Sequence, residues 1–349
     1  MNVLVTGHHG YIGSVLVSVL SSAGHQVTGL DTLFYDGCDL PTDEVEVTTL
    51  RADIRDIEAA QLQGFDAVVH LAALSNDPLG DLDRELTLDI NFRATVRVAE
   101  AAREAGVSRF VFSSSCSMYG AATDGLVAED APLRPLTAYA ESKVRSEEAL
   151  AELADDSFSP VFMRNATAYG ASPRLRLDLV LNNLVAWAHT TGRVKIMSDG
   201  TPWRPLIHVE DIGRATLAAL EAPRDLVHGE AFNVGRAEEN HQVRDLGEIV
   251  ERTIQGCEIE YAGSGDPDPR SYRVDFAKFE RTFPEAGLDW TAERGARELY
   301  DAYLASGLTL DEFEGGRYTR LKTLSALLDR GELDRDLRWR TPSLASEAR

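Results

Sequence analysis

The sequence predicts an α/β fold, in which a doubly wound parallel sheet is followed by a smaller, mostly helical C-terminal lobe. Three observations carry this prediction. Short apolar runs alternate with helical patterns over the first 165 residues, a glycine-rich turn follows the first run directly, and the regular alternation ends after Arg164. Near-continuous apolar strands separated by helices are typical of a parallel sheet that is covered on both faces.

Short runs of apolar and mostly β-branched residues are the predicted strands of this sheet: Val3–Thr6, Gln26–Asp31, Ala67–Leu71, Arg109–Ser113 and Pro160–Arg164. Apolar residues recur at helical spacing between them, which predicts helices over Tyr11–Ala23, Leu86–Ala105 and Ala138–Ala154. Residues 1–165 are expected to form a Rossmann domain, to which about 205–235 returns through short strands at 207–209 and 231–234.

The second part of the chain is less regular. We expect helices over 178–188 and 243–253, a loop over 201–206 and a helical tail over 292–338. Segments at about 166–204 and 236–340 are expected to form a substrate-binding lobe that closes over the carboxyl ends of the strands, with 341–349 as a frayed tail.

The charge balance limits the classes of partner. The chain has 35 basic and 57 acidic residues, a formal net charge of −22, which argues against nucleic acid and anionic membranes because both need basic surface. Three cysteines without a CxxC pair predict neither a disulfide framework nor a zinc site, and no metal is expected. Met1 runs directly into a predicted strand and no apolar run approaches ~18–20 residues, so we expect a cytoplasmic enzyme without a leader or membrane span.

Gly7, Gly10 and Gly13 have the spacing of a phosphate-binding turn between the first strand and the first helix. The first glycine allows the tight turn, the second lets a pyrophosphate approach the backbone, and the third lets the helix pack on the strand. The helix N-terminus at Tyr11 and Ile12 supplies free N–H groups and a partial positive charge. The expected ligand is therefore a dinucleotide.

Asp31 ends the second strand, where a carboxylate accepts hydrogen bonds from an adenosine ribose. The same carboxylate would repel a 2′-phosphate, so the expected cofactor is NAD rather than NADP. Asp53 and Ile54 follow a third short strand and are expected at the adenine edge.

Tyr139 and Lys143 lie four residues apart, on one face of a predicted helix. Ser115 follows the strand over 109–113, at the carboxyl edge where ligands bind in open α/β sheets. With these residues, the sequence resembles the extended short-chain dehydrogenase/reductase family, in particular its nucleotide-sugar epimerases and dehydratases. The resemblance covers most of the chain, and its further motifs are His70–Ala73, Asn91, Tyr119–Gly120, Asn182–Leu184 and Trp203–Val209.

The resemblance implies a general base in Tyr139, which takes a proton from a sugar hydroxyl as hydride leaves for the nicotinamide. A phenol with a pKa of about 10 is a poor base near neutrality, and Lys143 and the cationic nicotinamide are expected to lower that pKa. Ser115 is expected to share the sugar oxygen, and Lys143 to bind the nicotinamide ribose. The resemblance further implies cofactor contacts from Leu71, Ala72, Ala73, Asn91 and Ser113, with Asn91 also a structural support of the site and His70 a structural residue.

A nucleoside diphosphate sugar is the substrate that the resemblance implies. Arg204, with Arg270 or Arg273, is expected to neutralise its diphosphate, because a guanidinium binds phosphate in two-pronged geometry. Arg174 and Arg176 are weaker candidates for this role. The other implied substrate contacts are Ser75, Asn76, Ser117, Asn165, Asn183 and Leu184.

The two residues that directly follow Ser115 help to distinguish between the reaction types of the family. Sugar 4,6-dehydratases of this family have an Asp-Glu acid–base pair there, whereas this chain has Cys116, expected as apolar filler, and Ser117. The expected reaction is therefore epimerisation, by transient oxidation at the sugar C4 and hydride return. An NAD(P)-dependent reductase, dehydrogenase or dehydratase of the same family is the alternative. Asp77 could supply an acid–base group, which keeps chemistry at C3 or C5 open. A non-catalytic NAD-binding sensor protein is the alternative from another class.

The resemblance also implies a homodimer, in which helices 86–105 and 138–154 of two copies form a four-helix bundle. Two features depart from the family pattern. His8 and His9 replace the small residues common between the first two glycines, and are expected to be exposed near the pyrophosphate. The tail around 313–318 is longer than expected, and either covers the site or extends a dimer contact.

Overall fold

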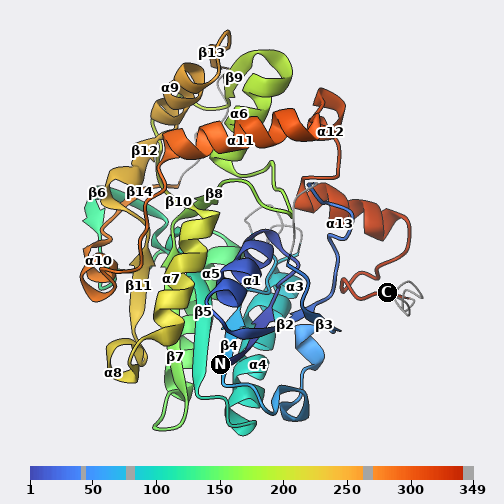
Figure 1. The fold of residues 1–349 in the computed structure, drawn as a ribbon, viewed down its shortest axis with the longest axis vertical. Helices are drawn as coiled ribbons and strands as arrows, with labels where there is room; N and C mark the ends of the chain where they lie inside the picture. The colour runs from blue at the N-terminus through green and yellow to red at the C-terminus, as the bar shows by residue number, and fades with distance from the viewer. Residues whose placement is uncertain (41–44, 76–82, 262–269, 341–349) are drawn as a thin grey trace.

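Residues 1–40, 45–75, 83–261 and 270–340 are described by a computed structural model. At its centre is a seven-stranded sheet with the order β11-β7-β5-β4-β1-β2-β3, in which all neighbouring strands are parallel (Figure 1). The strands are β1 (Asn2–Thr6), β2 (Gln26–Asp31), β3 (Thr48–Arg51), β4 (Ala67–His70), β5 (Arg109–Ser115), β7 (Ser159–Asn165) and β11 (Ala231–Val234). The predicted doubly wound fold is confirmed. The strand order reverses between β1 and β4, the point at which such sheets bind ligands.

Helices cover both faces of this sheet because the strands are apolar on both sides. Val3 and Val5 of β1 enter one hydrophobic cluster, while Leu4 between them enters the other. The first face carries α1 (Tyr11–Ser22) and α7 (Val209–Glu221), and the second carries α4 (Ala94–Glu104) and α5 (Ala138–Leu153).

The predicted helix over 86–105 is interrupted. It consists of α3 (Arg84–Leu88), a π-helical turn η3 (Asp89–Arg93) and then α4. Asn91 lies in this turn and is buried, and its amide accepts from the Leu74 N–H (2.7 Å) and donates to the Leu74 carbonyl (3.0 Å). Apolar spacing does not reveal a single wide turn, so a continuous helix was the wrong expectation.

The smaller lobe has a hydrophobic cluster of its own, built mainly by three helices (Figure 1). These are α6 (Val180–Thr191), α9 (Val243–Thr253) and α11 (Ala292–Ser306), beside the parallel pair β9 (Arg193–Ile196) and β13 (Glu258–Tyr261). The helix expected over 178–188 therefore begins two residues later and extends to Thr191.

A small sheet joins the two lobes. Its strand β10 (Trp203–His208) pairs with β8 (Thr167–Tyr169) and β12 (Asn240–Gln242). The loop expected over 201–206 is wrong from Trp203 onward, because the partners that make it a strand lie more than thirty residues away in the sequence. The remaining elements are η1 (Ile54–Asp56), η2 (Ala59–Leu62), η4 (Cys116–Tyr119), β6 (Ala121–Val127), α8 (Arg224–Val227), η5 (Ala237–Glu239), β14 (Ser271–Val274) and α10 (Ala277–Thr282).

The C-terminal segment returns to the large lobe through α12 (Leu310–Glu314) and α13 (Arg320–Asp329), which Figure 1 shows in red on the side of the molecule away from α9 and α10. Leu324 and Leu327 enter the same hydrophobic cluster as Leu4 of the central strand. Trp339 donates from Nε1 to the Thr32 carbonyl after β2 (2.7 Å). This segment is therefore part of the core of the large lobe, and we call residues 320–340 the C-terminal strap.

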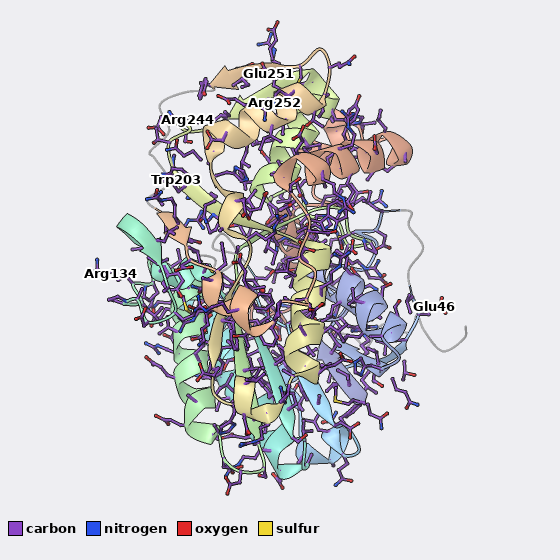
Figure 2. All side chains as sticks on the ribbon, turned by 60° about the vertical axis from the view of Figure 1, so that its left-hand side comes forward. Glu46, Arg134, Trp203, Arg244, Glu251 and Arg252 are labelled. Atoms are coloured by element: carbon purple, nitrogen blue, oxygen red, sulfur yellow. The ribbon has the colours of Figure 1, made fainter. Side chains whose placement is uncertain are left out.

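Charged side chains cover the outside of the molecule. Figure 2 shows Glu46, Arg134, Arg244, Glu251 and Arg252 at the surface, and all five are exposed. No helix of the described residues has the length and apolar character needed to cross a membrane.

Candidate active site

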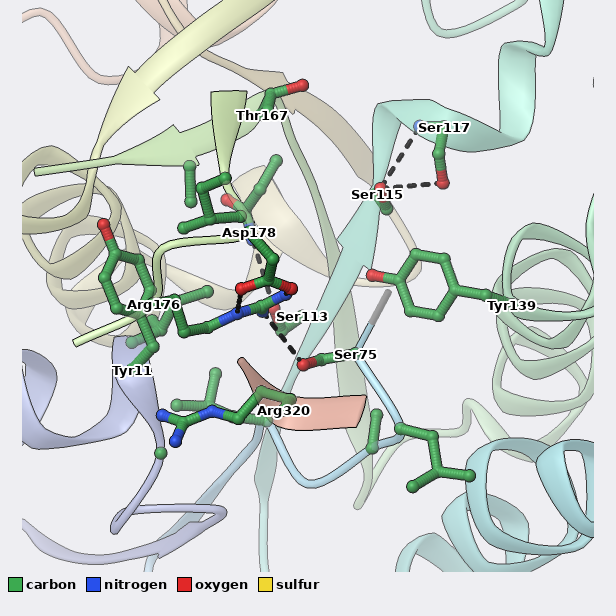
Figure 3. A pocket seen from close by; sticks show the side chains of 18 of the residues that line it. Tyr11, Ser75, Ser113, Ser115, Ser117, Tyr139, Thr167, Arg176, Asp178 and Arg320 are labelled. Carbon is green, nitrogen blue, oxygen red and sulfur yellow. Dashed lines mark hydrogen bonds and ion pairs between the residues drawn. The ribbon is translucent and has the colours of Figure 1, made fainter. Parts of the chain in front are cut away.

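A cavity of about 720 Å³ lies where the carboxyl ends of the central strands face the smaller lobe (Figure 3). It brings together nearly all of the predicted site residues, which lie far apart in the sequence. Those that line it are Gly7, Gly10, Tyr11, Ile12, Gly13, Asp31, Asp53, Ile54, Leu71, Ala72, Ala73, Ser75, Ser113, Ser115, Ser117, Tyr139, Lys143, Asn165, Asn183, Leu184, Arg204 and Arg270.

Two predicted residues do not line this cavity. Asn91 is buried behind the wall, where its amide holds Leu74 and donates to the Ser142 hydroxyl (3.3 Å). Arg273 lies instead with its guanidinium 5.1 Å from the centre of the Trp203 ring. The expected contact of Asn91 with the cofactor and that of Arg273 with the diphosphate are therefore not supported by their positions. Asn76 and Asp77 lie outside the described residues.

The glycine turn is shaped by close backbone contacts. Gly7 has a φ of +74°, and a Cβ there would lie 2.8 Å from the Ala72 nitrogen. A Cβ on Gly13 would lie 2.2 Å from the Gly7 carbonyl oxygen. Neither position accepts a side chain, so the turn can pack this closely only with glycine at both positions.

The histidine pair is not exposed as expected. His8 is 5% exposed; its ring fills the space beside Gly29, and its Nε2 is 2.9 Å from the Thr49 hydroxyl. A Cβ on Gly29 would collide with that ring at 2.2 Å, so Gly29 makes the pocket that His8 occupies. His9 is half-buried against the Arg174 guanidinium (Nε to Nδ1 3.2 Å), and burial, followed by Arg174, lowers the pKa of His9 to about 3.

Asp31 ties the end of β2 to the glycine turn. Its Oδ2 accepts from the His9 N–H (3.1 Å) and its Oδ1 from the Leu33 N–H (2.8 Å). Burial raises the pKa of Asp31, and these two hydrogen bonds oppose that shift. The carboxylate keeps free lone pairs with which it can accept from the hydroxyl groups of a ligand.

Asp53 reaches the cavity, but its carboxylate is also part of an ion pair. Arg55 binds it from Nε (3.0 Å) and Nη2 (2.6 Å), and donates from Nη1 to the Asp336 carbonyl (2.7 Å). Arg55 is buried and so connects the edge of the cavity to the C-terminal strap.

Ser115, Tyr139 and Lys143 meet at the carboxyl end of β5. Figure 3 shows the Tyr139 hydroxyl directed toward Ser115, and a hydrogen bond between these two side chains is among the influences on the pKa of Tyr139. The Ser115 hydroxyl donates to Ser117 Oγ (3.0 Å) and accepts from the Ser117 N–H (3.2 Å). One helical turn after Tyr139, Lys143 donates from Nζ to the Ser113 carbonyl (2.6 Å).

The electrostatics of this corner differ from the expectation. Burial raises the pKa of Tyr139, although the hydrogen bond with Ser115 and the charge of Arg176 oppose this rise. Burial also lowers the pKa of Lys143 to about 7, against an opposing effect of Glu147. Lys143 is thus only partly charged at neutral pH, and the predicted lowering of the Tyr139 pKa is absent from the protein alone.

Cys116 points away from the cavity. It is fully buried, its Sγ donates to the Arg164 carbonyl (3.0 Å), and burial raises the pKa of its thiol. Such a thiol does not exchange protons near neutrality, as expected for apolar filler. His70 is likewise buried, between the Thr6 (2.8 Å) and Thr95 (2.9 Å) hydroxyls, and burial lowers its pKa to about 3.

Arginines from the smaller lobe line the opposite wall. Arg204 donates from Nη1 to the Trp203 carbonyl (2.8 Å) and also to the Arg270 carbonyl, which fixes the two arginines relative to each other. Burial lowers the pKa of Arg270. Asn183, at the start of α6, donates to the Leu177 carbonyl (2.9 Å).

Several cavity residues had only weak signals in the sequence, or none. Arg176 forms a two-pronged pair with Asp178 (3.0 and 2.7 Å) and donates to the Ser75 hydroxyl (3.2 Å) in the middle of the cavity (Figure 3). The sequence marks Arg176 only as a weaker phosphate-binding candidate and Asp178 only as the start of a helix. The others that sequence reasoning missed are Tyr35, Lys195, Tyr272 and Arg320. No motif marks them, because each reaches the cavity through tertiary packing.

The cavity differs in charge from the whole chain. Its described lining contains seven basic side chains, of Arg55, Lys143, Arg176, Lys195, Arg204, Arg270 and Arg320. Against them stand the three carboxylates of Asp31, Asp53 and Asp178. The site therefore suits anionic ligands in a protein of net charge −22.

Comparisons of the sequence and of the fold with known proteins point to one family. A model of the NAD dependent epimerase/dehydratase family matches residues 3–235. A UDP-glucose 4-epimerase from Bacillus subtilis is 28% identical over 330 residues, covering 86% of this chain and 94% of that protein. The solved structure of MoeE5 with UDP-glucuronic acid and NAD has a TM-score of 0.74 and 29% identity, and covers 88% of this chain and 100% of that one. TunA, an NAD-dependent NDP-hexosamine 5,6-dehydratase of tunicamycin biosynthesis, has a TM-score of 0.78 and 25% identity, covering 87% and 98%.

Proposed function

The chain belongs to the NAD dependent epimerase/dehydratase family, and from this premise we propose that it epimerises a nucleoside diphosphate sugar at C4. The observation that carries the proposal is the corner of Ser115, Tyr139 and Lys143, which opens into the same cavity as the glycine turn. A family member with this corner can oxidise a sugar hydroxyl and reduce the resulting ketone again without net consumption of cofactor.

NAD is the cofactor of this family, and the residues present suit it. The glycine turn and the α1 N-terminus would hold the pyrophosphate, and Asp31 would accept from the adenosine ribose. The crowding at Gly7 and Gly13, where a Cβ would collide with backbone, supports this assignment. Asp53 and Ile54 would border the adenine, and Lys143 would bind the nicotinamide ribose.

Tyr139 is the proposed acid and base of the reaction. It would take the proton of the C4 hydroxyl, with Ser115 holding the same oxygen. NAD, when bound beside this corner, would supply the acceptor and donor for the hydride at C4. The 4-keto sugar then turns its other face toward the cofactor, and Tyr139 gives the proton back to the new hydroxyl oxygen. Because burial raises the pKa of Tyr139, its deprotonation depends on positive charge beside it, from Lys143 and from the oxidised cofactor.

The carboxylates of the cavity favour epimerisation over dehydration. Dehydration needs a further acid–base pair beside the sugar. Among the described lining residues, Asp53 is bound by Arg55 and Asp178 by Arg176, whose charge holds the pKa of Asp178 below its usual range. Asp31 accepts from two backbone N–H groups at the opposite end. Each is therefore poorly suited to donate a proton to a leaving hydroxyl.

We assign the sugar nucleotide to the side of the cavity built by the smaller lobe, so that segments 166–204 and 236–319 provide most of the substrate-binding lobe. The C-terminal strap, which was expected in this lobe, packs in the core of the large lobe instead. Arg204 and Arg270 would bind its diphosphate, with Asn183 and Leu184 beside them. Ser75, Ser117 and Asn165 would face the sugar, from the large lobe.

The test is conversion of a panel of UDP-, dTDP-, GDP-, CDP- and ADP-sugars by the purified protein without added reductant or oxidant. Epimerisation predicts that a C4 epimer accumulates to an equilibrium mixture, with no net change in absorbance at the wavelength of NADH. Loss of water or net consumption of a nicotinamide cofactor would instead identify a dehydratase or a reductase. If no sugar nucleotide is converted, epimerisation is refuted and the alternative of a non-catalytic NAD-binding sensor protein is favoured.

We also propose that two copies pair through the outer faces of η3–α4 and α5. Phe92, Val96 and Val144 are partly buried there, among exposed charges such as Arg97 and Arg145. Light scattering at micromolar concentration should then give the mass of a dimer, and a monomer mass would refute this interface.

A further inference from the structure

Arg320, the first residue of α13, carries a guanidinium that is almost completely buried at the cavity wall. The residue is 2% exposed and belongs to the cavity lining. Its Nη2 donates to the Arg174 carbonyl (3.0 Å), and its Cζ lies 4.0 Å from the centre of the Tyr35 ring. Its Nη1 is buried and has no hydrogen-bond partner within the described chain. Figure 3 shows the side chain extending into the cavity below Arg176.

Three other buried arginines of this protein differ from Arg320 in having a carboxylate partner. Arg164 binds Glu147 (2.7 Å), Arg174 binds Asp39 (2.8 Å), and Arg176 binds Asp178 (2.7 Å). No acidic group lies within 4 Å of the Arg320 guanidinium in the described part of the chain. A buried cation without a counter-ion is costly, and a guanidinium does not escape this cost by losing its proton. The arrangement is explained if an anionic ligand completes it.

The neighbours of Arg320 indicate which anion this is. Burial is the main cause of the lowered pKa of His9, and the charge of Arg320 adds to it; burial raises the pKa of Asp31, and Arg320 opposes that shift. Arg320 thus lies close to the glycine turn and the end of β2. Arg204 and Arg270, assigned to the sugar nucleotide, are held together by a separate hydrogen bond on the smaller lobe.

We propose that Arg320 binds the pyrophosphate of NAD, so that the C-terminal strap forms one wall of the cofactor site. The inference rests on the placement of the cofactor in the proposed function, but not on which sugar reaction follows. Nη1 has no partner within the described chain, while Nη2 and the Tyr35 ring hold the guanidinium in place. A phosphate oxygen can therefore pair with Nη1 while these two contacts are kept. The strap is itself fixed to the core by Leu324 and Leu327.

The experiment compares the full-length protein with its Arg320→Gln variant, by isothermal titration with NAD and with ADP-ribose, and by ligand-detected NMR with adenosine. We expect the variant to bind NAD and ADP-ribose about 10- to 100-fold more weakly, the effect of a lost charged hydrogen bond, and adenosine with unchanged affinity. Arg320→Lys keeps the positive charge but not the two-pronged guanidinium, and its affinity for NAD should lie between those of the wild type and Arg320→Gln. The matched control is Arg330→Gln at the other end of the helix, where Arg330 is exposed and paired with Glu332 (2.5 Å); it should bind NAD normally.

Thermal unfolding separates ligand binding from a purely structural role. If Arg320 serves the cofactor, Arg320→Gln without NAD should unfold at the wild-type temperature or above, because an unpaired buried charge is removed. The rise in unfolding temperature that NAD produces should shrink at the same time. Wild-type NAD affinity in the variant would overturn the proposal, as would an equal loss for adenosine or a lowered unfolding temperature without NAD. A protein that binds NAD through Arg320 but converts no sugar nucleotide would refute the proposed function alone.

Discussion

The two ends of the cavity are built in different ways. At the catalytic end, Ser115, Tyr139 and Lys143 come from one strand end and the following helix, within thirty residues of chain. At the cofactor end, Asp31 comes from the start of the chain, while Arg320 comes from the strap nearly 300 residues later. The first end depends on local geometry, because Tyr139 and Lys143 are one helical turn apart on α5. The second depends on tertiary packing of the strap against the sheet.

This difference determines how each end should respond to substitution. At the catalytic end, burial disfavours the charged forms of both groups, because it raises the pKa of Tyr139 and lowers that of Lys143. Substitutions there should change the reaction more than the stability. At the cofactor end, apolar residues of the strap are part of the core, so substitutions of these apolar residues should lower the stability of the protein before they change the reaction.

The largest effect is expected for Tyr139→Phe. Removal of the phenol oxygen should lower kcat by about a thousandfold, because no other group of this corner replaces the general base. The affinity for NAD should change little, since Tyr139 is not assigned to the pyrophosphate or the adenosine. Initial rates on a convertible sugar nucleotide and a titration with NAD measure both. Tyr303→Phe is the control, since it removes another buried tyrosine hydroxyl, bonded to the Asn182 carbonyl (3.2 Å), in the other lobe. Full activity in Tyr139→Phe would disprove the mechanism.

Leu324→Ala tests the strap as part of the core. Leu324 is fully buried in the hydrophobic cluster that also contains Leu4 and Leu30, so its truncation should reduce the free energy of unfolding by about 2–5 kcal/mol. Unfolding in urea, followed by circular dichroism, measures this change. Leu304→Ala is the control, because Leu304 is 52% exposed and should cost less than about 0.5 kcal/mol. Equal stabilities for the two variants would show that the strap does not contribute to the hydrophobic core.

Lys143→Met should lower kcat by about a hundredfold, since the charge that assists Tyr139 is lost. Its effect on stability depends on pH. Burial lowers the pKa of Lys143 in the folded state to about 7, well below the usual value for lysine, so the destabilising effect of burying the charge is fully present only below pH 7. That cost declines as the pH rises above 7, because the folded protein then loses the proton while the unfolded chain keeps it.

Melting curves across pH check this prediction for Lys143. Relative to wild type, Lys143→Met should unfold at an equal or higher temperature at pH 6, and the difference should move against the variant toward pH 10. A difference that stays constant over this range would contradict a lowered pKa. Lys322→Met is the control, because Lys322 is exposed and donates to the Glu314 carbonyl (2.6 Å), so its replacement should show no such trend.

The contrast between the two ends also explains what the sequence could predict. The strands and the helices after β1 and β5 follow from apolar runs and spacing, and the glycine turn, Asp31 and the catalytic corner follow from short motifs at known places on that framework. Burial of His8 could not be predicted, because it depends on Gly29 in the neighbouring strand. Arg320 could not be predicted either, since its place follows from how Leu324 and Leu327 pack, and spacing along a helix does not show which core a helix joins.

The smallest effect concerns two arginines that the sequence could not tell apart. Arg270 lines the cavity, whereas Arg273, three residues later, lies over the Trp203 ring at 5.1 Å. Arg270→Ala should raise the KM for the sugar nucleotide about tenfold or more, by loss of a charged contact with its diphosphate, and leave kcat within a few-fold. Arg273→Ala should change KM less than about twofold and lower the unfolding temperature slightly, since a cation–π contact is worth about 0.5–1 kcal/mol at a partly exposed site. Because the two variants remove the same charge from one strand region, a long-range electrostatic effect would raise KM equally in both. Only direct contact with the diphosphate predicts a large difference between them.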